Sequence, residues 1–296
     1  MFRLIKDSSF NFMENKKIPI VLSSIILLLS ILSIVTKGFN YGIDFSSGYV
    51  VQIKFNEKIS VLEVQNRMKS VGIDDASIQL YGSSQDIIVK LKDDTIFENK
   101  NVNNYLIEIF SDKKYEIKKL EYVGSQVGEE LREKGEWAML VALFSILIYV
   151  AIRFELIYGL GAITALIHDV VIMLGIFSFF ELSFDLSVLA AVLAVIGYSL
   201  NDSIVVFDRI RENNIALRKL NIDDVLNTSI NQTLSRTIVT SLTTLFVIIS
   251  LLIFGGSAVQ NFSIAMLIGI IIGTYSSIFI ASSSLSYYGI KRPELN

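Results

Sequence analysis

The stretch AVIGYSLNDSIVVFDRIREN, residues 194–213, begins as an apolar helix suited to a membrane and ends as a charged segment suited to water. Asn201 and Asp202 lie inside its apolar part. An aspartate in the hydrocarbon interior costs about 2.5 to 3.5 kcal/mol even on lenient insertion scales, so a span that keeps one usually has a functional reason. The way in which this chain accommodates Asp202 therefore bears on both its fold and its function.

The composition of the whole chain favours a membrane protein. Of its 296 residues, 52% are hydrophobic, which is more than an ordinary soluble protein of this size contains. The formal net charge of −3 argues against a nucleic-acid partner, because phosphate binding requires a concentrated basic surface. The absence of cysteine excludes disulfides, thiolate nucleophiles and cysteine-ligated metals.

Six apolar runs are long enough to cross a hydrocarbon core, which requires about 20 helical residues. They cover residues 18–35, 135–152, 156–180, 186–207, 236–254 and 262–285. The first run is followed by no convincing small-x-small cleavage site, so we expect it to remain as an anchor. The sequence therefore predicts a polytopic α-helical membrane protein with six transmembrane helices.

Lysine and arginine lie in the segments that fall on one side of the predicted membrane. They are Arg3, Lys6, Lys16, Lys17, Arg153, Arg209, Arg211, Arg218, Lys219, Lys291 and Arg292. The short loops on the other side, ELSFD and GGSAVQN, contain neither residue, which predicts that the basic side is cytoplasmic. We therefore expect a cytoplasmic N-terminus (1–17), a first transmembrane helix (18–36), an external segment (37–134), a five-helix membrane region (135–290) with a cytoplasmic loop (208–235), and a cytoplasmic tail (291–296).

The external segment 37–134 has the composition of a soluble domain, with 14 lysines and arginines against 16 aspartates and glutamates. Hydrophobic periodicity predicts strands at 49–55, 76–82, 85–92 and 115–124, and helices at 60–71, capped by Ser60, and at 95–110. The order βαββαβ predicts an external ferredoxin-like α+β domain inserted between the first two transmembrane helices. This segment contains no histidine and no nucleotide-binding loop, which favours contact with another macromolecule.

Asp202 and Arg236 are predicted to lie at similar depth on neighbouring antiparallel spans. On a helix, Asp202 shares a face with Tyr198, and Arg236 shares one with Thr244. One interpretation is a static salt bridge that orients two helices. The other is a titrating site, to which Asn201 also belongs, in which a proton on Asp202 weakens the attraction to Arg236 and changes the shape of the bundle.

His168 and Asp169 lie in the middle of the third span. Adjacent residues point about 100° apart on a helix, so the two cannot face one site equally. They form either a hydrogen-bonded structural pair or a second proton station. An aspartyl-protease dyad of Asp169 and Asp202 is disfavoured, because GYSLN precedes Asp202 where Gly-x-Gly would be expected. A metal site is disfavoured by the single histidine, so we predict no catalytic centre and no cofactor.

Glycines mark two further kinds of site. Gly269 and Gly273 lie four residues apart on the sixth span, a spacing typical of close helix packing, either inside the bundle or between subunits. Other glycines flank the external domain, and their backbone freedom predicts hinges in its two stalks. These stalk glycines are Gly42, Gly48, Gly124 and Gly128.

Five stretches of the sequence carry a resemblance to a known family, namely GIDFSSG, VGSQVGEEL, NDSIVVFDRIREN, LSRTIVTSLTT and FGG. Over nearly its whole length, the chain resembles the SecF family of the bacterial Sec protein-export machinery. The resemblance implies that Asp202 and Arg236 are the charged membrane pair, with a further aspartate supplied by SecD. The chain departs from the family at Ser47, where a second glycine is usual, and at Ser125, where proline is usual.

The resemblance also implies partners and a location. The chain would pair with SecD as half of a pseudosymmetric transporter similar to the resistance-nodulation-division superfamily, and associate with the SecYEG channel and YajC. A proton gradient, with sodium as the alternative, would help unfolded exported polypeptides leave on the outer side. The chain would span the bacterial inner membrane with both termini cytoplasmic and the large domain periplasmic, in contact with membrane lipid and with no nucleic acid.

Two other functions remain open. A half-size, RND-like proton-coupled efflux or lipid transporter predicts an apolar binding cleft in the external domain. A membrane-anchored binding scaffold predicts that neutral residues are tolerated at both Asp202 and Arg236.

Overall fold

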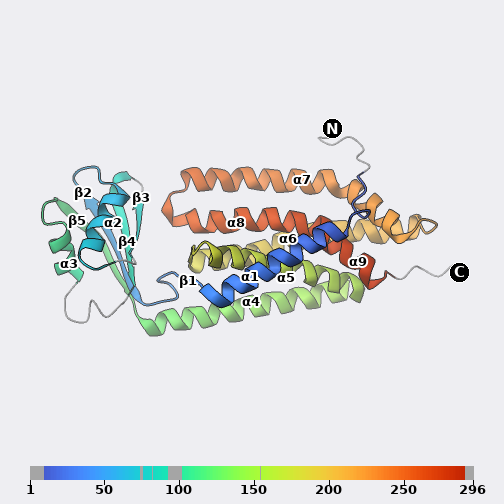
Figure 1. The fold of residues 1–296 in the computed structure, drawn as a ribbon, viewed down its shortest axis with the longest axis horizontal. Helices are drawn as coiled ribbons and strands as arrows, with labels where there is room; N and C mark the ends of the chain where they lie inside the picture. Colours follow the sequence, from blue (N-terminus) through green and yellow to red (C-terminus); the bar gives the residue numbers. More distant parts are fainter. Residues whose placement is uncertain (1–9, 74–75, 82, 93–101, 154, 291–296) are drawn as a thin grey trace.

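The computed structural model describes residues 10–73, 76–81, 83–92, 102–153 and 155–290. A small α+β domain lies at one end of a bundle of long helices (Figure 1). Within the described residues, six helices are long and apolar enough to cross a membrane, in agreement with the prediction. The predicted cytoplasmic ends, at residues 1–9 and 291–296, lie outside the described residues.

The bundle has central and peripheral helices. Its elements are α1 (Lys17–Lys37), α4 (Ser125–Arg153), α5 (Leu156–Phe179), α6 (Leu186–Ala216), α7 (Ile222–Phe254), α8 (Ser257–Ser276), the π-helical η2 (Ser277–Ala281) and α9 (Ser282–Tyr288). More than half of the apolar span is buried in α5, in α6 and in the α8-to-α9 segment, but less than a fifth in α1, α4 and α7. The first group therefore forms the centre, and the second leaves wide apolar surfaces for the membrane or a partner.

The predicted cytoplasmic loop 208–235 is mostly helical in the structure. Helix α6 continues to Ala216 and α7 begins at Ile222, so most of this segment is helical. A buried apolar seam continues along both extensions, and the Asn213 amide donates hydrogen bonds of 2.9 Å to Ser229 Oγ and to Gln232 Oε1. An uninterrupted apolar run ends at the first charged residues, whereas the amphipathic helix does not, so the run length alone did not predict these helical extensions.

The second stalk is helical as well. Helix α4 begins at Ser125, well before the predicted start of the span at residue 135, and runs from the α+β domain along the bundle (Figure 1). Outside the apolar part, Glu130 pairs with Lys134 at 2.6 Å and Arg132 with Glu136 at 3.6 Å. Ion pairs at this i,i+4 spacing support a helix in water. Helix α4 is therefore a continuous helix that joins the α+β domain to the bundle.

The α+β domain contains β2 (Gly48–Phe55), α2 (Val61–Ser70), β3 (Ser77–Tyr81), β4 (Ser83–Lys92), α3 (Val102–Ile109) and β5 (Tyr115–Val123). The strands pair antiparallel in the order β3-β4-β2-β5. The order of elements is the predicted βαββαβ. Residues 95–101 of the second predicted helix, and residue 82 of the predicted strand 76–82, lie outside the described part of the chain.

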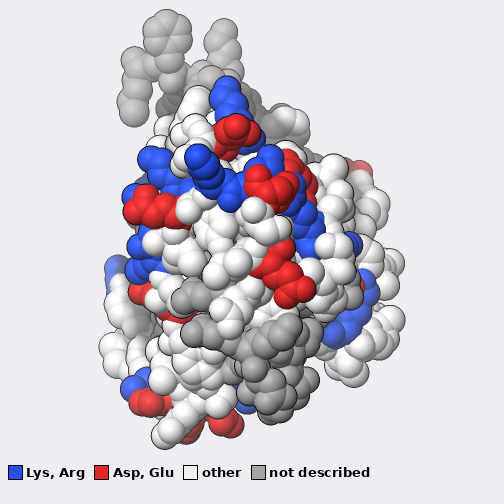
Figure 2. All heavy atoms as spheres, turned by 90° about the vertical axis from the view of Figure 1, so that its left-hand side faces the viewer, with Lys and Arg blue, Asp and Glu red and all other residues white. Residues whose placement is uncertain are grey.

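Period-two alternation builds the core of this domain. One face of the sheet packs against α2 and α3, and Ser60 caps α2 by accepting a 3.1 Å hydrogen bond from the Glu63 amide. The buried apolar side chains are Val51, Ile53, Phe55, Val64, Met68, Ile87, Val89, Leu91, Leu106 and Phe110. Figure 2 shows acidic and basic side chains interspersed over the outer end of the domain.

A short ladder fixes the first stalk to the bundle. Strand β1 (Asn40–Tyr41) pairs in parallel with β6 (Ser183–Phe184) in the α5–α6 loop. The ring of Phe184 packs against Phe39 and Phe45 at centroid distances of 5.5 and 5.9 Å. Two residues are too few for a strand pattern, so this joint is not predictable from the sequence.

Gly175 sets the distance between α5 and α1. A Cβ atom at this position would overlap the side chain and Cα of Ser30, so Gly175→Ala must separate the two helices. We expect this change to lower the free energy of unfolding by about 1–3 kcal/mol, measured by thermal unfolding of the purified chain. The matched control is Gly197→Ala, because nothing lies within 4 Å of the added Cβ. Equal melting temperatures for the two variants would contradict the packing argument.

Arg67 and Asp112 form a two-point ion pair on the surface of the α+β domain, with N–O distances of 2.5 and 2.8 Å. The hydrogen bonds from Arg67 hold the pKa of Asp112 below its ordinary value. Since the folded pKa is the lower one, the pair stabilises the domain above the unfolded pKa of about 4, and this contribution is lost as pH falls through the folded pKa. We expect Asp112→Asn and Arg67→Gln to remove the same acid-dependent step from the calorimetric unfolding of the domain. An acid-dependent step that stays undiminished in either variant would be inconsistent with this pair as the cause.

Candidate functional site in the membrane bundle

Asp169 of α5 lies where α5 meets α6 and α8, and it is 1% exposed. Its Oδ2 accepts hydrogen bonds from Ser199 Oγ of α6 at 2.5 Å and from Ser276 Oγ of α8 at 2.7 Å. Its Oδ1 lies 2.9 Å from Nδ1 of His168. Because a buried carboxylate is costly unless it is hydrogen-bonded, these contacts tie α5, α6 and α8 together at one level of the bundle.

His168 connects this level to α1. Its ring stacks on Tyr275 of α8, with the centroids 6.2 Å apart. The Tyr275 hydroxyl donates to the Pro19 carbonyl at 3.0 Å and lies 3.1 Å from Ser23 Oγ, both on α1. The other ring nitrogen of His168, Nε2, is buried without a hydrogen-bond partner in the described part of the chain. His168 and Asp169 therefore face different neighbours, as helix geometry requires, and also bond to each other.

Asp202 presents a different environment. It is 3% exposed, and its Oδ2 has no hydrogen-bond partner among the residues that the structure describes. It follows Ser199 by three residues, which is about 4.5 Å along the helix axis. Asp202 therefore occupies the layer next to the Asp169 network. An ionised carboxylate without a partner is among the most costly buried groups, so a proton or cation at this position would change the energy of the bundle strongly.

The predicted partner of Asp202 is placed differently. Arg236 of α7 and Asn201 of α6 both lie exposed on the surface of the chain. No hydrogen bond or ion pair joins Asp202 to Arg236 within the described residues, so the predicted static salt bridge is absent from this structure. The physical reason is orientation, because Asp202 is turned into the bundle and Arg236 is turned outward. The predicted faces do meet elsewhere, since Tyr198 donates a 3.3 Å hydrogen bond to Thr244.

The paired glycines of α8 face α6. A Cβ at Gly273 would lie 3.0 Å from the Cβ of Ser199, and one at Gly269 would overlap the side chain of Val195. This small-residue face therefore packs inside the chain, which decides between the two alternatives left open by the sequence. The close approach also brings Ser199 into the network around Asp169.

Three of the four stalk glycines are tightly packed, namely Gly42, Gly48 and Gly128. Gly128 lies within α4, and an added Cβ would be 2.9 Å from the carbonyl oxygen of Ser46, so the two stalks touch at this point. A Cβ at Gly124 would meet only an ordinary contact at 3.7 Å. Close packing against neighbouring atoms explains why three of these positions are glycine. The proposed action of the stalk glycines as hinges stays a prediction.

Three residues of the Asp169 network were not predicted from the sequence. Ser199, Ser276 and Tyr275 all contribute contacts to it. A partial signal exists for Ser199, which shares a helix face with Asp202. Ser276 and Tyr275 gave no comparable signal, because hydroxyl groups in membrane helices often bond only to their own backbone.

Six apolar helices, carboxylates buried between them and an α+β domain after the first helix define a polytopic membrane protein. Residues 102–291 match the family described as protein export membrane protein SecD/SecF, C-terminal, and residues 32–59 match the SecD/SecF GG motif. The chain belongs to the SecD/SecF family.

Relatives and solved structures agree with this assignment. The protein translocase subunit SecF of Calditerrivibrio nitroreducens is 47% identical over 94% of each chain, and that of Pseudomonas aeruginosa is 42% identical over 98% of this chain and 95% of the relative. The crystal structure of SecDF from Thermus thermophilus, a translocon-associated membrane protein, matches 95% of this chain with a TM-score of 0.81 and 39% identity. This chain spans 39% of that SecDF chain.

Removing a donor to Asp169 tests whether this network holds the central helices. Ser276→Ala leaves a buried acceptor with one donor fewer, and we expect it to lower the free energy of unfolding by about 1–3 kcal/mol. Ser284→Ala is the control, since Ser284 Oγ donates to the Ala281 carbonyl on its own helix at 2.6 Å. Thermal unfolding in the same detergent measures both variants. An unaltered melting temperature for Ser276→Ala would show that the network carries little of the stability.

Proposed function

We propose that this chain acts in protein export as a SecF-type subunit, paired with SecD, and that protonation of Asp202 couples the proton gradient to this work. The observation that carries the proposal is the buried carboxylate of Asp202 on the central helix α6, whose Oδ2 has no hydrogen-bond partner among the described residues. Membership of the SecD/SecF family and relatives named protein translocase subunit SecF support the role in export. No hydrolytic reaction and no cofactor form part of the proposal.

The energy available is sufficient for such a step. One elementary charge that moves through 100 mV gains about 2.3 kcal/mol, which shifts a two-state equilibrium by roughly fiftyfold. When Asp202 is ionised, it attracts the guanidinium of Arg236 on α7. When it is protonated, this attraction disappears and the neutral side chain is tolerated inside the bundle. Proton binding would therefore change the preferred position of α6 relative to α7.

The exposed side chains of Asn201 and Arg236 support a partner subunit. A polar or charged side chain at the level of the membrane costs energy against lipid, and it is normally covered by another protein surface or a wet cavity. We propose that SecD covers this face and supplies a further aspartate. This chain corresponds to 39% of a SecDF chain, which agrees with the proposal that it makes up one part of such an assembly. Contacts with SecYEG, YajC and exported polypeptide belong to the same proposal.

The distribution of basic residues supports an orientation. Arg153, at the end of α4, and the α6–α7 turn with Arg218 and Lys219 lie at the end of the bundle away from the α+β domain (Figure 1). Basic residues favour the cytoplasmic side. We therefore propose an inner-membrane protein with cytoplasmic termini and a periplasmic, ferredoxin-like α+β domain that contacts the exported chain.

Asp202→Asn tests the coupling role directly. We expect the variant to insert and pair with SecD normally but to lose the part of preprotein export that depends on the gradient, because the amide cannot take up a proton. Export into inverted membrane vesicles, with and without a proton gradient and with a sodium gradient in its place, measures the effect. The matched control is Glu212→Gln, a carboxylate in the same helix that is exposed and pairs with Arg209 at 2.9 Å.

The rival functions give different results in the same assay. Full gradient-dependent export by Asp202→Asn would remove Asp202 from the mechanism and leave a binding scaffold. A normal export rate together with lost transport of a small apolar molecule would indicate an efflux or lipid transporter. A response to sodium alone would replace the proton as the coupling ion.

A further inference from the structure

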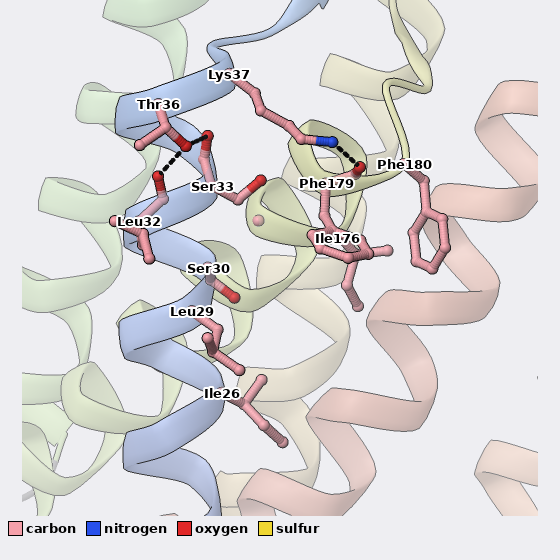
Figure 3. Close-up of a pocket in the computed structure, with 11 residues that line it drawn as sticks. Ile26, Leu29, Ser30, Leu32, Ser33, Thr36, Lys37, Ile176, Phe179 and Phe180 are labelled. Atoms are coloured by element: carbon pink, nitrogen blue, oxygen red, sulfur yellow. Dashed lines mark hydrogen bonds between the residues drawn. The ribbon is translucent and has the colours of Figure 1, made fainter.

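A cavity of about 340 Å³ lies between α1 and α5, near the end of α1 that leads to the α+β domain (Figure 3). Its walls include the apolar side chains of Leu29, Leu32, Ile176, Phe179 and Phe180. Apart from Ile176, these side chains are exposed on the surface of the bundle. The cavity is therefore a groove that opens toward the surroundings of the bundle and not toward its core.

Two of the hydroxyl groups in the wall are satisfied within the protein. Ser33 Oγ lies 3.1 Å from Ser178 Oγ, and Thr36 Oγ1 donates to the Leu32 carbonyl at 2.7 Å. Ser30 contributes one further hydroxyl, so a ligand in the groove would meet a mostly apolar surface. The groove lies between two helices of the bundle and most of its apolar side chains are exposed, so it is open to the hydrocarbon chains that surround a membrane helix.

The mouth of the groove carries one positive and one negative group side by side. Lys37 Nζ lies 3.0 Å from the Phe179 carbonyl, to which it donates, and 3.2 Å from Glu181 Oε1. Glu181 has a φ of 53°, a left-handed conformation that a residue other than glycine rarely adopts. Its carbonyl accepts a 2.9 Å hydrogen bond from the Asn40 amide, which helps to hold the residue there. The fold thus keeps an ammonium and a carboxylate at the level where a membrane helix ends.

We propose that this groove binds phosphatidylethanolamine from the leaflet nearest the α+β domain, with one acyl chain between α1 and α5. Charge complementarity selects the headgroup, because Lys37 matches its phosphate and Glu181 matches its primary ammonium. An anionic headgroup without the ammonium would meet the repulsion of Glu181. A choline headgroup cannot donate hydrogen bonds to that carboxylate. The inference stands on the groove and its mouth, and it does not require the proposed role in export.

Native mass spectrometry of the purified full chain tests the site, with equimolar phosphatidylethanolamine, phosphatidylcholine and phosphatidylglycerol. We expect selective retention of phosphatidylethanolamine. Ile176→Trp fills the groove and should abolish retention, and Lys37→Gln should weaken it by about two- to fivefold, as for an exposed ion pair. Glu181→Gln should remove the preference for ethanolamine over choline. Lys219→Gln, an exposed lysine at the other end of the bundle, is the matched control and should change nothing.

A second measurement locates the ligand and does not depend on variants of the groove floor. The chain contains no cysteine, so Leu29→Cys provides a single attachment point for a photoreactive label in native membranes. Crosslinks to phosphatidylethanolamine support the proposal, and crosslinks to a polypeptide overturn it. Equal retention of all three lipids by the unaltered chain, or undiminished retention by a stably folded Ile176→Trp variant, would also overturn it.

Discussion

The bundle depends on the cost of a carboxylate placed where water is absent. Asp169 is tolerated because Ser199 and Ser276 donate hydrogen bonds to it from two other helices. These donors reach Asp169 only if the helices lie close together, and Gly273 permits this approach, because a side chain at that position would crowd Ser199. In lipid, apolar surface alone does not drive helices together. One polar requirement thus explains why small residues lie where α6 meets α8.

The two buried aspartates have different environments, and this difference separates structure from function. Asp169 accepts hydrogen bonds on both oxygens and sits among the most buried helices. Asp202, one helical turn from Ser199, has an oxygen without a partner in the described structure and lies on the helix that also contacts the peripheral α7. A carboxylate whose two oxygens both accept hydrogen bonds resists change, whereas an unsatisfied one responds to a proton or to a partner. The position of Asp202 beside a fixed network suits a group whose ionisation shifts one helix against a stable centre.

Much of the fold follows from two patterns in the sequence, the length of its apolar runs and the alternation of apolar and polar residues. Apolar run length gave the number of membrane helices, and alternation gave the order of elements in the α+β domain. The helix ends did not follow, because Asn213 and its partners continue the contact between α6 and α7 beyond the apolar run. The candidate site was only partly predictable. Spacing placed Asp202 and Arg236 on neighbouring helices, but the direction of each side chain depends on packing between helices, which spacing along a single helix does not contain.

The two connections between the α+β domain and the bundle differ in stiffness, and this difference limits how the domain can move. The first connection is held by the β1–β6 ladder and by the rings around Phe184. The second is the continuous helix α4, which has the smallest buried share of the six spans in the described chain. A displacement of the domain must therefore either break the ladder or carry α4 with it. Since α4 has few neighbours to hold it, movement of α4 is the less costly route. Because α4 also touches the first stalk at Gly128, this movement links the position of the domain to the arrangement of the membrane helices.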